Sequence, residues 1–299
     1  MAYHDLRDYL AQLESSGQLR RVDELVATEL ETTSLCVRAL RAEGPALLFE
    51  RPSSSAHPLL GNLFGHRKRI EAALAGRPLS SLRELGELLA AIKEPRWPGS
   101  VREALAAWPE FAQLAHAAPR RVPDAAFRDE VLTGEDVDLM RLPIQRCWPD
   151  DAGLLLTMAM VVTRGTRRER QNVGIYRQQV LGRNRVIMRW LPHRGGALDF
   201  ADWRAAHPDR PFPVLVAIGA DPAMMLAAVA PVPDTLSEFQ FAGLLRGERS
   251  RVWRSDLTGL DAPAGAEIVL EGLIHPGDGA LEGPFGDHTG YYNAQGEFP

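Results

Sequence analysis

The longest apolar stretch in the sequence runs from Pro213 to Pro233, and Asp221 and Pro222 interrupt it near its middle. A helix that crosses a bilayer needs about 20 consecutive apolar residues, so a charged residue followed by a proline argues against a membrane span. The first part of the stretch, residues 214–218, is a short apolar run of the kind found in buried strands. We therefore predict a buried strand followed by a helix in the core of a globular fold.

Composition supports a globular protein. Of the 299 residues, 45% are hydrophobic and 24% are charged, and the length predicts about two domains. A net charge of −5 argues against a general nucleic-acid binder, which needs clustered positive charge. Two cysteines, Cys36 and Cys147, are too few for a disulfide framework or a zinc site, so a reducing compartment is expected. The N-terminus lacks the apolar segment of a signal peptide, which predicts a cytoplasmic protein.

The order of the elements predicts an α+β fold. An N-terminal α/β domain is expected over residues 1–117, because helical periodicity alternates there with short apolar runs. Helices are expected near residues 6–13, 28–42, 67–74, 82–92 and 101–107, and strands near residues 21–24, 46–49 and 58–64. Two prolines and a glycine break the pattern within residues 94–100, and the domain boundary is expected near residues 118–123.

A second domain is expected over residues 118–299, where short strands are separated by glycines and prolines. This pattern is typical of a β-barrel or β-sandwich with inserted helices. The basic run at residues 164–170 is typical of a solvated hairpin tip, with a phosphate-binding role as the alternative. The strands are expected within residues 154–163, 177–180, 185–191, 214–218 and 266–274.

Two clusters in this second domain combine arginines with glycines. Residues 171–177 place an amide, a glycine and an arginine among apolar residues, and a buried guanidinium needs a partner; an edge-strand arginine that reaches solvent is the alternative. Residues 189–196 place arginines around a turn with two glycines, which suits a phosphate. His193 in this turn is a candidate metal ligand or phosphate contact, or else a structural histidine.

Two further clusters carry acids. Thr235 and Glu238 have the spacing of a capping box, so Glu238 is either a helix cap or a carboxylate ligand for a hard cation. Glu282 and Asp287 lie in a loop rich in glycine, proline and aromatic residues. Two acids near an arginine can raise the pKa of one carboxyl for proton donation, and a solvated surface loop is the alternative.

Four stretches, in this order, resemble the UbiD family of reversible decarboxylases, and the likeness runs from Leu6 through the whole chain. The resemblance implies a flavin-reductase-like split β-barrel for residues 118–299. It also implies prenylated FMN, supplied by a flavin prenyltransferase, with Mn²⁺ (or Mg²⁺) on its phosphate and K⁺ nearby. The stretches are residues 172–177 (NVGIYR), 189–196 (RWLPHRGG), 232–239 (VPDTLSEF) and 282–291 (EGPFGDHTGY).

The resemblance also implies a role for individual residues. Asp287 corresponds to the proton donor, in a catalytic network with Arg177 and Glu282. The implied metal ligands are Asn172, His193 and Glu238. The implied cofactor-binding residues are Ile175, Tyr176, Arg177, Arg189, Trp190, Leu191, Arg194 and Gly195.

The reaction implied by the resemblance is the non-oxidative decarboxylation of 3-polyprenyl-4-hydroxybenzoate to 2-polyprenylphenol in ubiquinone biosynthesis, with peripheral association at the inner membrane. Another aromatic acid as substrate is one alternative. Family members are longer and form homo-oligomers through a C-terminal domain, whereas this sequence stops at Pro299, so a truncated, inactive flavin-binding fragment is a second alternative. A plain flavin oxidoreductase is the third, although hydride transfer does not need two acids with an arginine.

Overall fold

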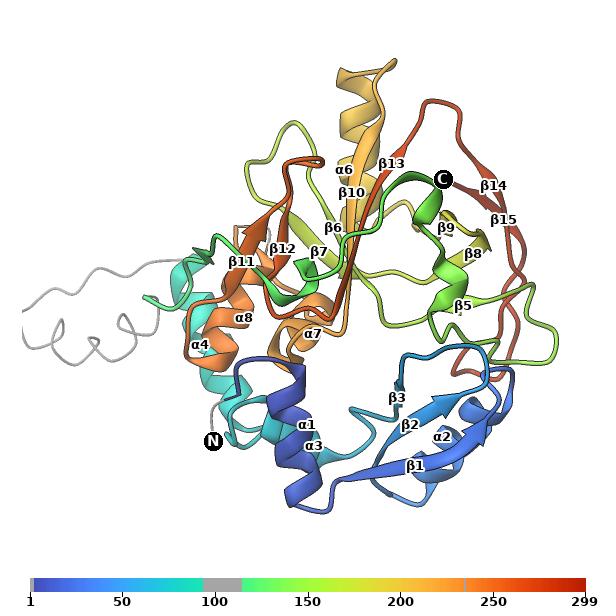
Figure 1. The fold of residues 1–299 in the computed structure, drawn as a ribbon. Coiled ribbons are helices and arrows are strands. Elements are labelled where there is room, and N and C mark those ends of the chain that lie inside the picture. Colours follow the sequence, from blue (N-terminus) through green and yellow to red (C-terminus); the bar gives the residue numbers. More distant parts are fainter. Residues whose placement is uncertain (1–2, 94–114, 234) are drawn as a thin grey trace, which may run out of the picture.

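The structure is a computed structural model that describes residues 3–93, 115–233 and 235–299 (Figure 1). In the N-terminal part, β1 (Leu19–Val26) and β2 (Ala46–Pro52) pair in parallel, and β3 (Leu59–Gly61) runs antiparallel to β2. Helix α2 (Glu31–Arg41) connects the two parallel strands, which is the α/β arrangement that the sequence predicts. The other helices of this part are α1 (Leu6–Ser15), α3 (Arg67–Ala73) and α4 (Ser81–Lys93).

Helix α1 shows why these segments become helices. The side chain of Asp5 accepts a hydrogen bond from the backbone N–H of Asp8 and so caps the first turn. Leu6, Tyr9 and Leu13 recur at helical spacing and are buried. The apolar stripe of α1 therefore holds the helix against the rest of the molecule.

The second part contains four small sheets, in the strand orders β13-β10-β6-β7, β5-β8-β9, β12-β11-β4 and β14-β15. Three single 3-10 turns, at Ala126–Arg128, Gly134–Asp136 and Leu139–Arg141, lie between β4 and β5. The strands are β4 (Arg120–Arg121), β5 (Leu155–Leu156), β6 (Met160–Thr163), β7 (Asn172–Ile175), β8 (Gln178–Gly182), β9 (Arg185–Met188), β10 (Phe212–Ile218), β11 (Arg251–Arg254), β12 (Asp261–Pro263), β13 (Ile268–Ile274), β14 (Ala280–Glu282) and β15 (Gly296–Phe298). The helices are α6 (Gly195–Ala206), α7 (Pro222–Val229) and α8 (Glu238–Arg246).

The interrupted apolar stretch forms β10 and α7, which confirms the prediction of a strand followed by a helix. Strand β10 is central, with β13 on one side and β6 on the other. Asp221 caps α7 by accepting from the N–H of Met224, and Pro222 occupies the first turn, where its missing N–H is not needed. No helix among the described residues is both long and apolar enough to cross a membrane.

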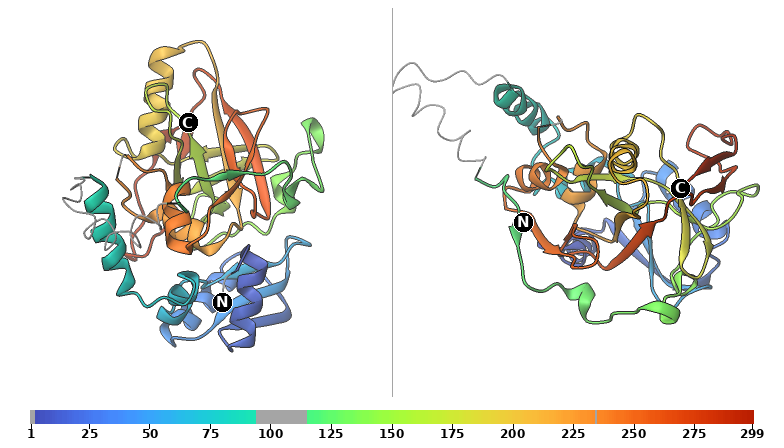
Figure 2. Two further views of the ribbon diagram at one scale, coloured as in Figure 1. Left: turned by 90° about the vertical axis from the view of Figure 1, so that its left-hand side faces the viewer. Right: turned by 90° about the horizontal axis from the view of Figure 1, so that it is seen from above.

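One hydrophobic cluster joins the two parts of the chain. Tyr9 and Leu13 of α1 belong to the same buried cluster as Met160, Leu215 and Met224 from the second part. The N-terminal sheet lies at one end of the molecule and α6 at the other (Figures 1 and 2). The division into domains at residues 117 and 118 stays a prediction.

Several expectations need correction. The run at residues 154–163 forms two short strands, β5 and β6, and the strand expected at residues 58–64 is three residues long. The helix expected from Thr28 begins only at Glu31, after Leu30 with a positive φ of 64°. The described sheets are small and none closes into a barrel, so the structure shows a mixed α/β fold and the split β-barrel stays a prediction. The helix expected at residues 101–107 and the break at residues 94–100 lie outside the described residues.

Candidate active site

Strand β7 carries candidate residues at both of its ends. Asn172 begins the strand, and Arg177 lies two residues beyond its last residue, at the start of β8 in the neighbouring sheet. An extended chain of this length spans at most about 17 Å. The two sides of the site are therefore separated by one strand, and each is described in turn below: the arginine end around Arg177 and the acidic end around Asn172.

The arginine end is an ion network around a fully buried carboxylate. Glu282, on β14, has 0% of its surface exposed. Its Oε1 accepts from Nε of Arg177 at 2.8 Å and its Oε2 from Nη2 of Arg177 at 3.1 Å. Oε2 also accepts from Nη1 of Arg189 at 2.7 Å. Two guanidinium groups thus share one carboxylate, which leaves an excess positive charge suited to binding an anion.

Further contacts hold the two guanidinium groups in place. Nη2 of Arg177 donates to Oδ1 of Asn293 at 2.7 Å, and the Arg177 guanidinium lies 5.3 Å from the ring centre of Phe285. The Arg189 guanidinium lies 5.0 Å from the ring centre of Phe298. These cation–π contacts further restrict the two arginines. Sequence reasoning missed Asn293, although it follows directly after the loop that holds both acids.

Asp287 differs from Glu282 in its surroundings. Its Oδ1 accepts from the backbone N–H of Thr289 at 2.8 Å and from the Thr289 hydroxyl. These hydrogen bonds lower the pKa of Asp287, and the charges of His288 and Arg177 act in the same direction. The expectation of a raised pKa for the donor carboxyl is therefore wrong in this arrangement, because the donors around Asp287 stabilise its ionised form.

The loop that carries Asp287 is anchored by a buried acid that the sequence did not point to. Asp151 is 3% exposed, and its Oδ1 accepts from the backbone N–H of Gly286 at 2.9 Å. Its Oδ2 accepts from the N–H groups of Cys147 and Trp148 at 3.1 and 2.8 Å. A Cβ on Gly286 would lie 2.3 Å from the Trp148 ring, so this glycine permits the close approach. Three backbone donors on one carboxylate fix the position of the loop.

The acidic end brings Asn172 close to Glu238. Glu238 is the first residue of α8, and its Oε2 accepts from the backbone N–H of Val173 at 2.9 Å. The side chain is buried, which raises the pKa of Glu238, and the negative charge of Asp199 acts in the same direction. Glu238 thus contacts the backbone one residue beyond Asn172, and carboxylate and amide oxygens are donors that a hard divalent cation prefers.

The expected capping box has a different register. Ser237, not Thr235, is the N-cap of α8, and its side chain pairs reciprocally with Gln240. The prediction that Glu238 takes part in the capping box is therefore wrong, because Ser237 and Gln240 form the reciprocal hydrogen bonds at the first turn of α8. This leaves the Glu238 carboxylate facing β7.

His193 lies in the turn before α6 with an exposed side chain, as do Leu191 and Arg194. Among the described residues, no group of three or more His, Cys, Asp and Glu side chains is arranged to hold a metal ion. The predicted set includes the amide of Asn172 and has only two members of those four types, so it stays a prediction.

The N-terminus of α6 passes very close to β7. A Cβ on Gly195 would lie 1.9 Å from Oδ1 of Asn172, so the Asn172 side chain holds this position only because residue 195 is a glycine. The N–H of Gly196 donates to the Tyr176 hydroxyl at 3.1 Å. Arg194 precedes the helix without a side-chain cap, and the positive end of a helix of 12 residues suits a phosphate group. The residues present therefore fit the phosphate of a flavin mononucleotide.

Aromatic residues line the segment between the two ends. Trp190 is buried, and its ring lies 6.3 Å from that of Tyr176 in an edge-on arrangement. Its indole N–H has no hydrogen-bond partner among the described residues. Ile175, at the end of β7, packs against the main core. The predicted cofactor-binding residues thus divide into the buried Trp190 with the half-buried Ile175 and Tyr176, the two guanidiniums, and an exposed turn that leads to Gly195.

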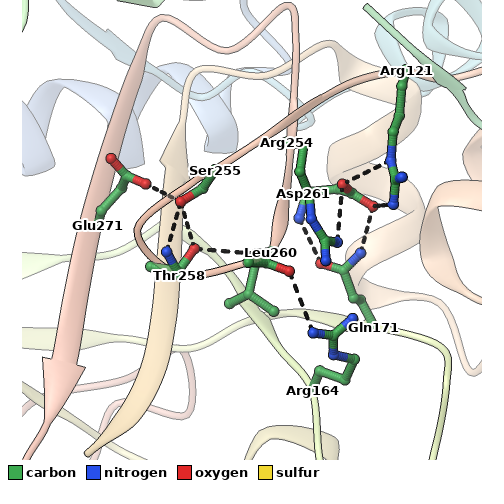
Figure 3. Close-up of polar contacts among 10 residues, drawn as sticks. Arg121, Arg164, Gln171, Arg254, Ser255, Thr258, Leu260, Asp261 and Glu271 are labelled. Carbon is green, nitrogen blue, oxygen red and sulfur yellow. Dashed lines mark hydrogen bonds and ion pairs between the residues drawn. The ribbon is translucent and has the colours of Figure 1, made fainter.

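Behind this site, a polar network fixes the start of β7 (Figure 3). Gln171 donates through Nε2 to Oδ2 of Asp261 at 2.7 Å and accepts from the Asp261 backbone N–H at 2.6 Å. Arg254 and Arg121 pair with the same carboxylate at 3.3 and 3.4 Å. Since Gln171 directly precedes Asn172, this network ties the first residue of β7 to β12.

Comparisons with known proteins agree with this arrangement. Residues 120–299 match the UbiD family, described as the 3-octaprenyl-4-hydroxybenzoate carboxy-lyase Rift-related domain, and residues 10–89 match the N-terminal domain of the same description. The UbiD-class enzyme HmfF from Pelotomaculum thermopropionicum, solved in complex with FMN, is 33% identical with a TM-score of 0.82 over 99% of this chain and 60% of its own.

Two other solved structures are similar. An evolved dimeric form of HmfF from Pelotomaculum thermopropionicum in complex with prFMN is 31% identical, with a TM-score of 0.80, over 99% of this chain and 63% of its own. Vanillic acid decarboxylase from Sedimentibacter hydroxybenzoicus, in its closed form, is 27% identical, with a TM-score of 0.82, over all of this chain and 60% of its own. The chain thus spans about three fifths of the length of the structures it matches. Because the family match covers more than half of the residues and the folds agree, the chain belongs to the UbiD family.

Proposed function

We propose that this protein is a decarboxylase of an aromatic acid that uses prenylated FMN. The observation that carries the proposal is the pairing of Arg177 and Arg189 on the buried Glu282, one strand away from the glycine cradle at Gly195. The first feature suits a carboxylate and the second a phosphate, and their separation suits an elongated flavin. The FMN and prFMN in the HmfF structures support the same cofactor.

Arg177, Arg189 and Asp287 have different roles in the proposed reaction. Arg177 and Arg189 bind and orient the carboxylate of the substrate, because their combined charge exceeds that of Glu282. Asp287 delivers the proton to the carbon that loses CO₂. Its lowered pKa means that it is ionised at neutral pH in the free protein, so it must take a proton from solvent before it donates one. Prenylated FMN, when bound, supplies an acceptor for the electrons left on that carbon.

At the other end, Asn172 and Glu238 would hold Mn²⁺ or Mg²⁺ against the flavin phosphate, with His193 as the third ligand and K⁺ nearby. The contact of the Glu238 carboxylate with the backbone of Val173, the residue after Asn172, supports this assignment. A flavin prenyltransferase would supply the cofactor. The split β-barrel is part of the same proposal, and the direct passage from β7 into β8 of the next sheet supports it.

The substrate we propose is 3-polyprenyl-4-hydroxybenzoate, converted to 2-polyprenylphenol in ubiquinone biosynthesis by a homo-oligomer that is cytoplasmic or peripheral at the inner membrane. The description of the matching family supports this choice. A second candidate is a small aromatic acid without a prenyl chain. The vanillic acid decarboxylase among the similar structures favours it.

The test is to produce the protein together with a flavin prenyltransferase in medium with manganese. Mass spectrometry of the released small molecules should find prenylated FMN, and decarboxylation should be assayed with prenylated and unprenylated hydroxybenzoates and with vanillic acid. The substrate with the highest kcat/KM decides between the two candidates.

The variant Asp287→Asn should lower kcat at least about 100-fold, because general acid catalysis contributes that much, while the bound flavin stays unchanged. Asp278→Asn is the matched control, since Asp278 is a partly exposed loop acid that lies 4.0 Å from Arg185. Full turnover in Asp287→Asn would contradict the donor assignment. Protein that folds but holds no flavin would contradict the proposed function as a whole.

A further inference from the structure

We propose that Thr163 and Asp199 are positioning residues that orient the carboxamide of Asn172, so that its oxygen faces the N-terminus of α6, where the cation binds. This inference rests on the proposed function, because it concerns the cation that the acidic end would hold. It adds two residues, neither of which is a ligand and neither of which lies within the four sequence motifs.

The three side chains form a continuous chain of hydrogen bonds. Thr163 ends β6 and pairs directly with Asn172 in the register of β6 and β7. The Thr163 hydroxyl donates to Oδ2 of Asp199 at 2.7 Å, and Nδ2 of Asn172 donates to the Thr163 hydroxyl oxygen at 3.3 Å. Thr163 is fully buried and Asp199, on α6, is 4% exposed. The hydrogen bond between Thr163 and Asp199 is therefore shielded from water, and Asn172 reaches it from a half-buried position.

The order of donors and acceptors in this chain of hydrogen bonds determines the orientation of the Asn172 carboxamide. A hydroxyl has a single proton, and the Asp199 carboxylate receives it. The hydroxyl oxygen can then only accept, and the amide NH₂ is the group that donates to it. The amide oxygen must consequently point the other way, which is where Oδ1 lies against Gly195.

This orientation matters for a cation but not for packing. The oxygen and the NH₂ of a carboxamide have nearly the same size, so either orientation fills the same space. Only the oxygen can ligate Mn²⁺ or Mg²⁺. Groups that orient metal ligands typically change metal affinity about 10- to 100-fold when they are removed.

The alternative is that Thr163 and Asp199 only join α6 to β6. In that case loss of the hydroxyl lowers the stability of the fold and leaves cation binding unchanged. The two readings differ in the dissociation constant for Mn²⁺, which can be measured without turnover.

The experiment compares Thr163→Val, which keeps the shape and loses the hydroxyl, with Thr163→Ser, which keeps the hydroxyl. Free Mn²⁺ is followed by electron paramagnetic resonance during titration of the protein with saturating FMN. Thr163→Val should bind Mn²⁺ about tenfold or more weakly. Thr163→Ser should stay within about threefold of the unchanged protein.

Thr258→Val is the control for stability. Thr258 is also buried, and its hydroxyl takes part in a network with Ser255, away from β7 (Figure 3). It should lower the midpoint of thermal unfolding and leave the Mn²⁺ affinity unchanged. If Thr163→Val does not fold, Asp199→Ala replaces it, since it frees the hydroxyl to donate to the amide oxygen and should weaken Mn²⁺ binding in the same way.

The outcomes separate the two proposals. The first outcome is that Thr163→Val binds Mn²⁺ as tightly as the unchanged protein does. This result would overturn the positioning role and leave the proposed function intact, and the same holds for Asp199→Ala where that variant replaces Thr163→Val. Absence of Mn²⁺ binding in the unchanged protein would overturn the cation site, and the positioning role with it. The third outcome is that Thr163→Val, or Asp199→Ala where that variant replaces it, binds Mn²⁺ more weakly while Thr163→Ser keeps the affinity of the unchanged protein. This result establishes the positioning role.

Discussion

The two ends of β7 differ in the sign of the charge that gathers around them. At the arginine end, two guanidinium groups surround the single buried carboxylate of Glu282. At the acidic end, the carboxyl groups of Glu238 and Asp199 are both buried, burial raises the pKa of each, and the charge of Asp199 raises the pKa of Glu238 further. The first arrangement favours an anion and the second a cation. The two ends of one strand therefore form sites that prefer ligands of opposite charge. The proposed function requires both, because a cation would bind the flavin phosphate and the substrate carries a carboxylate.

The two ends also differ in what holds their carboxyl groups in place. The arginine end is an ion network with a bidentate contact, an amide partner and two aromatic rings. At the acidic end, the Glu238 and Asp199 side chains accept hydrogen bonds from a backbone N–H and a hydroxyl, and the positive charges of Arg168 and Arg170 favour the ionised form of Asp199. We expect mutations at the arginine end to change stability strongly, and mutations at the acidic end to change ligand binding more than stability.

The largest effect on stability should come from Glu282→Gln. It leaves two guanidinium groups without their buried counter-charge, and the free energy of unfolding should fall by about 3 kcal/mol. Glu267→Gln is the matched control, because its partner Arg7 is 79% exposed, and it should cost less than about 1 kcal/mol. Urea unfolding followed by circular dichroism measures both. Equal losses in the two variants would show that the network at Glu282 is no stronger than a surface ion pair.

An intermediate effect is expected from Gly195→Ala at the acidic end. The new methyl group would collide with Oδ1 of Asn172, and that side chain can swing away. Stability should fall by only about 1 kcal/mol, while the affinity for Mn²⁺ in the presence of FMN should fall at least about tenfold. Titration calorimetry measures the affinity.

Gly272→Ala serves as the control for this prediction, since a Cβ there meets open space. It should leave both stability and Mn²⁺ affinity within error. Unchanged Mn²⁺ binding in Gly195→Ala would separate Asn172 from the cation site.

The smallest effect concerns the pH dependence set by Asp287. The Thr289 hydroxyl and N–H lower the pKa of Asp287, so Thr289→Val should raise it by removing one donor. Because the protonated carboxyl is the active form of a proton donor, the alkaline limb of the kcat profile should move to higher pH, by about one unit or less. Thr289→Ser keeps the hydroxyl and should keep the profile. A shift toward lower pH in Thr289→Val would assign the limb to another group.

Elements with a strong periodic pattern could be predicted from the sequence. The helix expected at residues 67–74 is present as Arg67–Ala73, and the run at residues 214–218 lies within β10. Short elements were less predictable, because pairing with distant strands decides where a short strand ends. Strands β5 and β6 share one apolar run but pair with different partners.

The motifs identified the candidate residues, and their local chemistry indicated a phosphate, a hard cation and a carboxylate. They could not show that Asp151 holds the loop of Asp287, or that Thr163 contacts Asp199, since these contacts join residues 135 and 36 positions apart. They also misassigned the cap of α8, where Thr235 and Ser237 are both acceptable by pattern and the geometry of the turn selects Ser237.

Residue types and spacing were thus sufficient for the family and for a set of candidate reactive groups, because these depend on local chemistry and short-range periodicity. The burial of Glu282 between two arginines and the contact of Thr163 with Asp199 depend on folding. The reason is physical: the energy of a charge or a hydrogen bond is set by the groups and the solvent around it, and folding brings those groups from distant parts of the chain.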